Sequence, residues 1–193
     1  MLKRLSFLLL LFPGIDAMAG SIEEPKYELL DTLDNVELRL YGPSIQATTA
    51  LRSGNQTTSG FRRLAGYIFG GNDSGQTIAM TAPVQETLTA GPSVMAFTMP
   101  SGFSMESLPT PDSEKVVLRE VPERLVASLS FGGWATSGKV ERKTASLLET
   151  LERYNATVEG DPILNQYNPP WTLPFMRRNE IVVEITFDYL AEI

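Results

Sequence analysis

The chain of 193 residues contains no cysteine and no histidine. Without cysteine it can form no disulfide, no thiolate nucleophile and no cysteine metal site. Without histidine it lacks the commonest general base and the commonest protein ligand of transition metals. These two absences weigh against catalysis that depends on a thiolate, an imidazole base or a histidine-bound metal.

Other catalytic and nucleotide-binding patterns are also missing. No serine lies in Gly-x-Ser-x-Gly, and no Ser-x-x-Lys occurs. Residues 133–140 approach a Walker phosphate loop, but Val140 stands where that motif needs Ser or Thr for magnesium. Paired carboxylates such as Glu23 and Glu24 could still act as acid and base, although a solvated face explains them more simply. We therefore predict a protein without enzymatic activity.

Negative charge predominates, with 23 acidic and 16 basic residues and a formal net charge of -7. Such a surface repels the phosphate backbone of nucleic acids. We therefore expect no nucleic-acid partner.

The first 19 residues have the three parts of a secretory signal peptide. Lys3 and Arg4 precede an apolar run over 5–12, and the small residues Ala17-Met18-Ala19 form a cleavage site. This run of eight residues, apolar except for Ser6, is far shorter than the ~20 that a spanning helix needs. We expect cleavage after Ala19, no membrane span afterwards, and an exported protein that is periplasmic or secreted. Removing two cations and one anion from -7 leaves a mature net charge of -8.

Hydrophobic periodicity predicts an α+β fold made of two similar halves. Strands are predicted at 27–33, 36–41, 45–51, 78–80, 94–99, 116–121, 125–131, 161–167 and 180–187, and helices at 61–68 and 139–154. The strand patterns at 36–41 and 45–51 recur at an offset of 80 residues, each pair followed by a helix. We predict one domain over 20–193, with two ββαββ halves from an internal duplication. Their sheets should join into one curved, mostly antiparallel sheet or open barrel flanked by two helices.

Two segments carry apolar side chains that need a partner. The first helix has an apolar stripe at i, i+3, i+4 and i+7, formed by Phe61, Leu64, Ala65 and Ile68. The loop over 168–178 contains three prolines and four large apolar residues, Trp171, Leu173, Phe175 and Met176, before two arginines. Such a loop either closes over the core or lines a ligand site. The residues alone favour closure, because aromatic side chains usually pack in the core.

Four motifs between and beside these segments carry a family resemblance. Gly70-Gly71-Asn72-Asp73-x-Gly75, Met80-Thr81-x-Pro83-Val84, Tyr167-Asn168-Pro169-Pro170 and Arg177-Arg178-Asn179-Glu180 occur in that order. Together they resemble the SOUL/haem-binding protein family, from about Pro25 to Ile185. The resemblance implies a distorted barrel with two helices, similar to the effector-binding domains of some bacterial regulators. It also implies non-covalent binding of haem or another tetrapyrrole in an apolar groove.

The resemblance assigns the groove to the first helix and the late loop. One wall would be Phe61, Leu64, Ala65 and Ile68, the other Leu173, Phe175 and Met176, with Arg63 and Arg177 paired to propionates. Because the usual haem ligand, histidine, is absent, the iron could be held by Tyr67 or Met176 or by no side chain. Two alternatives stay open, a protein-interaction module of the cell envelope and a hydrolase-like enzyme on the related effector-binding fold. The sequence does not predict an oligomeric state.

Overall fold

The computed structural model describes residues 22–51, 57–89 and 91–186. The predicted signal peptide, 1–19, lies outside these residues. The described chain contains, in order, β1 (Tyr27–Leu33), β2 (Val36–Tyr41), β3 (Ser44–Leu51), α1 (Thr57–Ile68), β4 (Val84–Thr87), β5 (Ser93–Thr98), β6 (Val117–Val121), β7 (Arg124–Gly132), α2 (Ser137–Arg153), β8 (Thr157–Gln166), the 3-10 turn η1 (Pro174–Met176) and β9 (Arg178–Thr186). This composition confirms the predicted α+β class.

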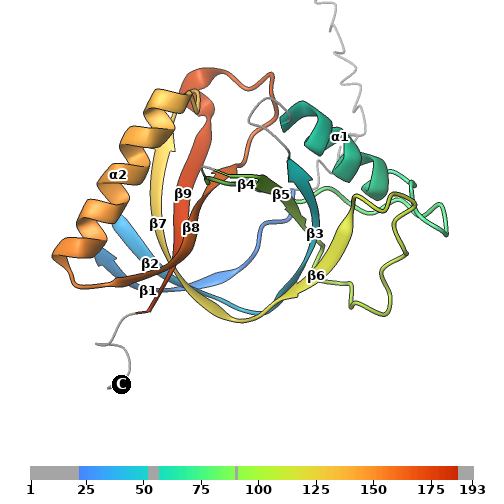
Figure 1. The fold of residues 1–193 in the computed structure, drawn as a ribbon, viewed down its shortest axis with the longest axis horizontal. Coiled ribbons are helices and arrows are strands. Elements are labelled where there is room, and N and C mark those ends of the chain that lie inside the picture. The colour runs from blue at the N-terminus through green and yellow to red at the C-terminus, as the bar shows by residue number, and fades with distance from the viewer. Residues whose placement is uncertain (1–21, 52–56, 90, 187–193) are drawn as a thin grey trace, which may run out of the picture.

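All nine of these strands belong to one antiparallel sheet, in the spatial order β1-β2-β7-β9-β8-β4-β5-β3-β6. Because β1 and β6 stand at the two ends of that order, the sheet curls round without closing (Figure 1). The two helices lie on the outer side of the curl. The predicted distorted barrel with two flanking helices is therefore confirmed, as an open barrel.

The two halves use the same pairing pattern and exchange one strand. In the first half β5 pairs with β3 and β4, and in the second β9 pairs with β7 and β8. The strand that precedes each of these units pairs across the molecule: β2 lies beside β7, and β6 lies beside β3. β4 and β8 join the halves at the centre. Each half thus completes the sheet of the other.

A separate apolar core lies beneath each helix. Under α2, thirteen buried residues from β1, β2, β7, β8, β9 and the helix itself form one cluster. Under α1, a second cluster is built from the helix, β3, β5 and the segments on either side. Leu64 and Ile68 lie in this second cluster and are almost fully buried. Burial of each such side chain contributes about 1.5–3 kcal/mol, so the two helices are fixed by these contacts.

Two glycines let α1 fit where it does. Gly60 faces β3, and a Cβ at this position would collide with the side chain of the fully buried Leu51. Gly70 follows the helix with φ of +101°, a backbone conformation that glycine adopts without steric cost. The helix therefore ends where the Gly70-Gly71 pair predicts it should.

The prediction of a strand at 78–80 is wrong. The amide of Ile78 donates to the carbonyl of Ile68 at 2.7 Å, and its side chain is buried in the α1 cluster. This apolar run therefore packs against the end of the helix and not in the sheet. The strand of the first half comes after Pro83, as β4, where the sequence Val-Gln-Glu-Thr has little apolar character. β8 also begins four residues before its predicted start at Asp161.

Candidate functional site

The late loop, predicted at 168–178, occupies residues 167–177 between β8 and β9 and does not close over the core. Trp171 is 83% exposed and Phe175 is 81% exposed, and Leu173 and Met176 are also exposed. The closure favoured by the residues alone is therefore wrong. Trp134, in the turn between β7 and α2, is a further exposed aromatic residue beside this loop. We call these five residues, Trp134, Trp171, Leu173, Phe175 and Met176, the loop surface.

Arg177 braces this loop from within. Its side chain is buried, its Nε donates to the carbonyl of Thr172 at 3.0 Å, and its Nη2 donates to the carbonyl of Pro170. Its guanidinium carbon also lies 3.8 Å from the centre of the Trp134 ring. The cation predicted to pair with a propionate is therefore already occupied in holding the loop. The apolar residues stay exposed because this buried contact fixes the backbone beneath them.

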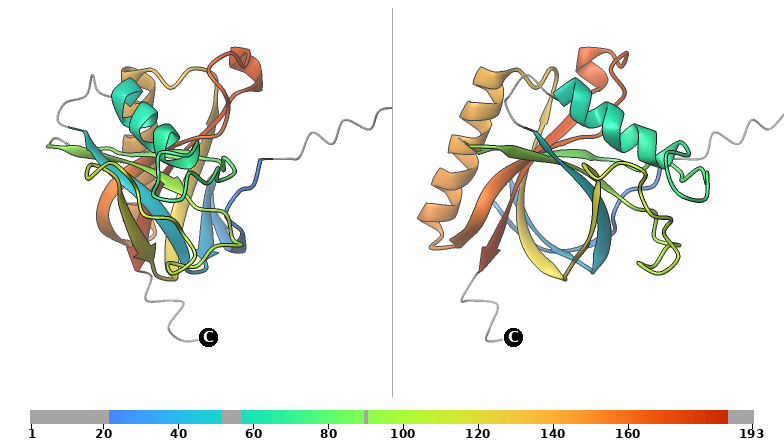
Figure 2. Two further views of the ribbon diagram at one scale, coloured as in Figure 1. Left: turned by 90° about the vertical axis from the view of Figure 1, so that its right-hand side faces the viewer. Right: turned by 45° about the vertical axis from the view of Figure 1, so that its right-hand side comes forward.

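α1 and the late loop lie at the same end of the molecule in all three views (Figures 1 and 2). Of the predicted helix wall, Phe61 is 42% exposed and packs edge-on against Phe97, with ring centres 5.4 Å apart. Ala65 is partly buried. Leu64 and Ile68 point into the core, so a ligand at the surface does not reach them.

The polar candidates on α1 also make internal bonds. Arg63 donates from Nε to the hydroxyl of Thr49 at 2.9 Å and from Nη2 to the carbonyl of Ala50 at 2.8 Å, while remaining partly exposed. Tyr67 is buried, and its hydroxyl donates to the carbonyl of Pro109 at 3.0 Å. Burial, and then the charge of Asp73, raise the pKa of Tyr67 above its ordinary value. Tyr67 therefore cannot serve as a tyrosinate ligand at the surface.

Sequence reasoning missed a polar network on the inner face of the sheet. The guanidinium of Arg39 on β2 donates two bonds to the carboxylate of Glu180 on β9, at 3.0 and 3.2 Å, and both side chains are buried. The hydroxyls of Tyr167 and Ser130 donate to the same carboxylate at 2.6 and 3.2 Å. Burial, and then the charge of Glu180, raise the pKa of Tyr167 well above its ordinary value. Arg39 and Tyr167 therefore keep their protons at neutral pH, and the polar groups of the network bond to one another.

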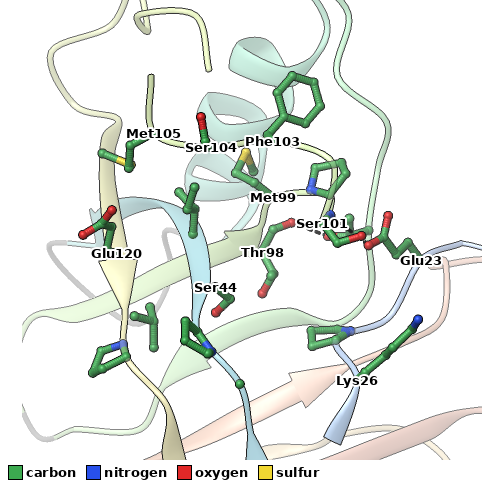
Figure 3. A pocket seen from close by; sticks show the side chains of 18 of the residues that line it. Glu23, Lys26, Ser44, Thr98, Met99, Ser101, Phe103, Ser104, Met105 and Glu120 are labelled. Atoms are coloured by element: carbon green, nitrogen blue, oxygen red, sulfur yellow. Dashed lines mark hydrogen bonds between the residues drawn. The ribbon is translucent and has the colours of Figure 1, made fainter. Parts of the chain in front are cut away.

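A cavity of about 890 Å³ was also missed (Figure 3). It lies between the segment before β1, the start of β3, the end of β6 and the loop over 99–106. These four segments are far apart in the chain and polar or proline-rich, so no periodic pattern marks them. No group of three or more acidic residues that could hold a metal ion is present in the described part of the chain. No described helix is long and apolar enough to cross a membrane.

Comparison with known proteins places the chain in a family. Its residues 22–184 match the family described as SOUL heme-binding protein. Mouse Heme-binding protein 1 is 33% identical over 123 residues, which span 60% of this chain and 64% of that protein. Mouse Heme-binding protein 2 is 26% identical over 190 residues, which span 88% of this chain and 91% of that protein.

Solved structures share the fold at low sequence identity. The C-terminal domain of EcmrR has a TM-score of 0.60 at 10% identity, over 83% of this chain and 98% of that chain. A hydrolase from Listeria innocua has a TM-score of 0.61 at 11% identity, over 79% and 92%. At this identity the likeness concerns the fold alone, and the family rests on the sequence match. Because that match covers most of the chain and most of the described residues, the protein belongs to the SOUL heme-binding protein family.

Proposed function

We propose that this protein binds haem or another tetrapyrrole non-covalently, against the loop surface and the exposed side of Phe61. The observation that carries the proposal is the set of large apolar side chains held exposed on a braced loop in a chain of this family. Large apolar side chains exposed close together in the chain are typical of binding sites. A flat macrocycle can cover Trp171 and Phe175 by stacking, which removes apolar area from water at ~25 cal/mol per Å².

The propionates and the iron would meet few partners. Arg63 is partly exposed but would have to leave Thr49 and Ala50 to meet a propionate, and the buried Arg177 would have to leave the carbonyls of Pro170 and Thr172. With no histidine in the chain, the thioether of the exposed Met176 is the axial ligand within reach of this surface. Affinity would therefore depend mainly on apolar contact, and the ferric Soret band should resemble that of weakly ligated haem.

Titration of the purified protein with haemin, followed by absorbance, tests the proposal. Trp171→Ala and Phe175→Ala should each weaken binding at least about fivefold, because each removes a large stacking surface. Neither should lower the melting temperature, because both side chains are exposed. Leu29→Ala is the matched control: Leu29 is 53% exposed on β1, in another part of the sheet, and its loss should leave the titration unchanged.

Ile68→Ala separates the surface from the predicted helix wall. Since Ile68 is buried in the α1 core, its truncation should lower stability by about 2–4 kcal/mol and leave haemin affinity of the folded protein unchanged. A loss of affinity at unchanged stability would instead assign the ligand to the inner side of α1. Absence of saturable haemin binding at micromolar concentration in the wild type would end the tetrapyrrole proposal.

A further inference from the structure

The cavity of about 890 Å³ has the volume of a small-molecule site and is separate from the loop surface. Its lining comes from 23–26, 42–45, 81, 98–101, 103–106 and 120–122, and contains no residue of α1 or of the late loop. Figure 3 shows Met99 near the middle of the lining, with Phe103 and Met105 from the following loop beside it. The walls therefore come from four different segments of the fold.

The body of the cavity is apolar and adaptable. Ile45, Met99 and Phe103 are buried or partly buried, and they belong to or pack against the α1 core. Met105 is partly buried in the lining as well. Methionine side chains are flexible and polarisable, and they make favourable contacts with aromatic rings. The cavity can thus accept aromatic or aliphatic groups of more than one shape.

The charges around this apolar body are mostly negative. Four carboxylates, those of Glu23, Glu24, Glu106 and Glu120, line the cavity, against one ammonium, that of Lys26. Glu24 is paired with Arg178, and the remaining carboxylates exceed the cation. Figure 3 shows Glu23 and Glu120 on opposite sides of the opening. Low-dielectric walls focus such a field into the cavity, so it attracts cations and repels anions.

The Glu23 carboxylate is fixed as well as charged. Its Oε1 accepts a bond from the amide of Ser101 at 2.9 Å, and this bond, more than any other contact, lowers the pKa of Glu23 below its ordinary value. The carbonyl of Glu23 accepts the amide of Ala82 at 2.9 Å, which fixes the segment before β1 as one wall. The Glu23 carboxylate is therefore ionised at neutral pH, and both the side chain and the backbone of Glu23 are held by hydrogen bonds.

We propose that this cavity binds a cationic amphiphile, an organic cation whose body carries aromatic or branched aliphatic groups. The apolar lining takes the body, and the carboxylates around the opening take the charge. A tetrapyrrole with two ionised propionates would meet repulsion here, so the site is distinct from the one proposed for haem. It does not depend on that proposal.

Tetraphenylphosphonium and tetraphenylborate test the charge selectivity, because the two ions have nearly the same size and shape and opposite charge. Calorimetric titration of the purified protein should show saturable binding of the cation at least about tenfold tighter than that of the anion. Equal affinity for the two ions, tighter binding of the anion, or no saturable binding of the cation up to millimolar concentration would each overturn the proposal.

Two double variants locate the site. Glu106→Gln with Glu120→Gln removes two carboxylates from the cavity, and Glu141→Gln with Glu149→Gln removes two exposed carboxylates from α2. Both change the net charge equally. The first should weaken binding of the phosphonium at least about fivefold, while the second should change it less than about twofold. Equal effects of the two would mean that only the overall charge acts, and would overturn the site.

Met105→Ala tests the apolar contact at the same cavity. It should lower the affinity for tetraphenylphosphonium at least about threefold, because an apolar contact is lost. The melting temperature should change little, because Met105 is only partly buried. Unchanged affinity in this variant would contradict binding inside the cavity. Haemin titration of the Glu106→Gln, Glu120→Gln variant should match that of the wild type. The proposal for the cavity and the proposal for haem are therefore tested independently.

Discussion

At the scale of single residues, the pair of Arg39 and Glu180 is the least expected feature. Two ionised side chains are buried together on the inner face of the sheet, where removal from water costs several kcal/mol per ion. Burial disfavours the charged guanidinium, but the bonds to Glu180 outweigh it and raise the pKa of Arg39. Glu37 bonds to the same guanidinium at 2.7 Å from a partly exposed position. Arg39 therefore has one buried and one exposed anionic partner.

This arrangement predicts different costs for two equivalent substitutions. Glu180→Gln should lower the free energy of unfolding by about 3 kcal/mol, because it leaves a buried cation short of its main partner. Glu37→Gln should lower it by less than about 1 kcal/mol, because water screens the exposed partner. Urea unfolding followed by circular dichroism measures both. Similar losses in the two variants would mean that the buried pair contributes no more than the exposed one.

The sequence cannot show which apolar residues face a core and which face a ligand, for a physical reason. An apolar helical stripe looks the same whether it faces a core or a ligand, so Leu64 and Ile68 were assigned to a groove when they pack on the sheet. The alternation predicted the burial of Val36 and Leu38 correctly, but Leu40 is only half-buried and Arg39 on the opposite face is buried too. Strand alternation does not reveal that a sheet will curl until its polar face closes on itself.

At the scale of elements, the late loop shows how a few contacts keep apolar side chains in water. Arg177→Ala removes both carbonyl contacts and the stacking on Trp134. It should destabilise the protein by about 1–3 kcal/mol, because the carbonyls of Pro170 and Thr172 lose a charged donor. It should also speed proteolysis between residues 168 and 176. Haemin affinity should fall as well, since the loop surface would no longer be held in place.

Arg178→Ala is the neighbouring control for that prediction. Arg178 also lies over an aromatic ring, Tyr167, and pairs with Glu24, but about half of its side chain is exposed. Its removal should cost less than about 1 kcal/mol and leave the loop resistant to protease. Mass spectrometry of the cleavage products identifies the site. Equal cleavage in both variants would contradict a specific bracing role for Arg177.

Elements with a strong local signal were predicted well, and those fixed by distant contacts were not. Both helices and most strands lie within a few residues of their predicted bounds, because their apolar periodicity is regular. β4 has four residues and no clear pattern, and its position is fixed by pairing with β5 and β8. The run at 78–80 is apolar because it packs on α1. A short apolar run does not by itself show whether it pairs in a sheet or packs against a helix.

At the scale of the whole molecule, the recurrence at 80 residues predicted two similar halves but not how they join. The matching strands β3 and β7 have the same burial pattern over their first eight residues. The exchange of β2 and β6 has no signature in the sequence, because pairing partners are decided by contacts between the halves. The α2 core accordingly contains Leu33, Val36 and Leu38 from the first half.

The exchange predicts that neither half folds alone. A fragment of residues 20–112 would lack β6, the edge partner of β3, and would leave β2 without β7. A fragment of 113–193 would lose three buried residues, Leu33, Val36 and Leu38, from the core under α2. Losses of about 1.5–3 kcal/mol for each buried side chain exceed what a half of this size can spare. Each fragment alone should therefore give a circular dichroism spectrum without a cooperative thermal transition.

Mixing the two fragments at equal concentration should restore the spectrum and a cooperative transition, with a melting temperature that rises with concentration, because folding now requires association. Cutting the chain instead within the second half, between 134 and 135, gives the control. That cut separates α2 and its partner strands β8 and β9 from β7 and so divides one core, and its fragments should recombine more weakly. Cooperative unfolding of either 20–112 or 113–193 by itself would show that a half is complete without its exchanged strand.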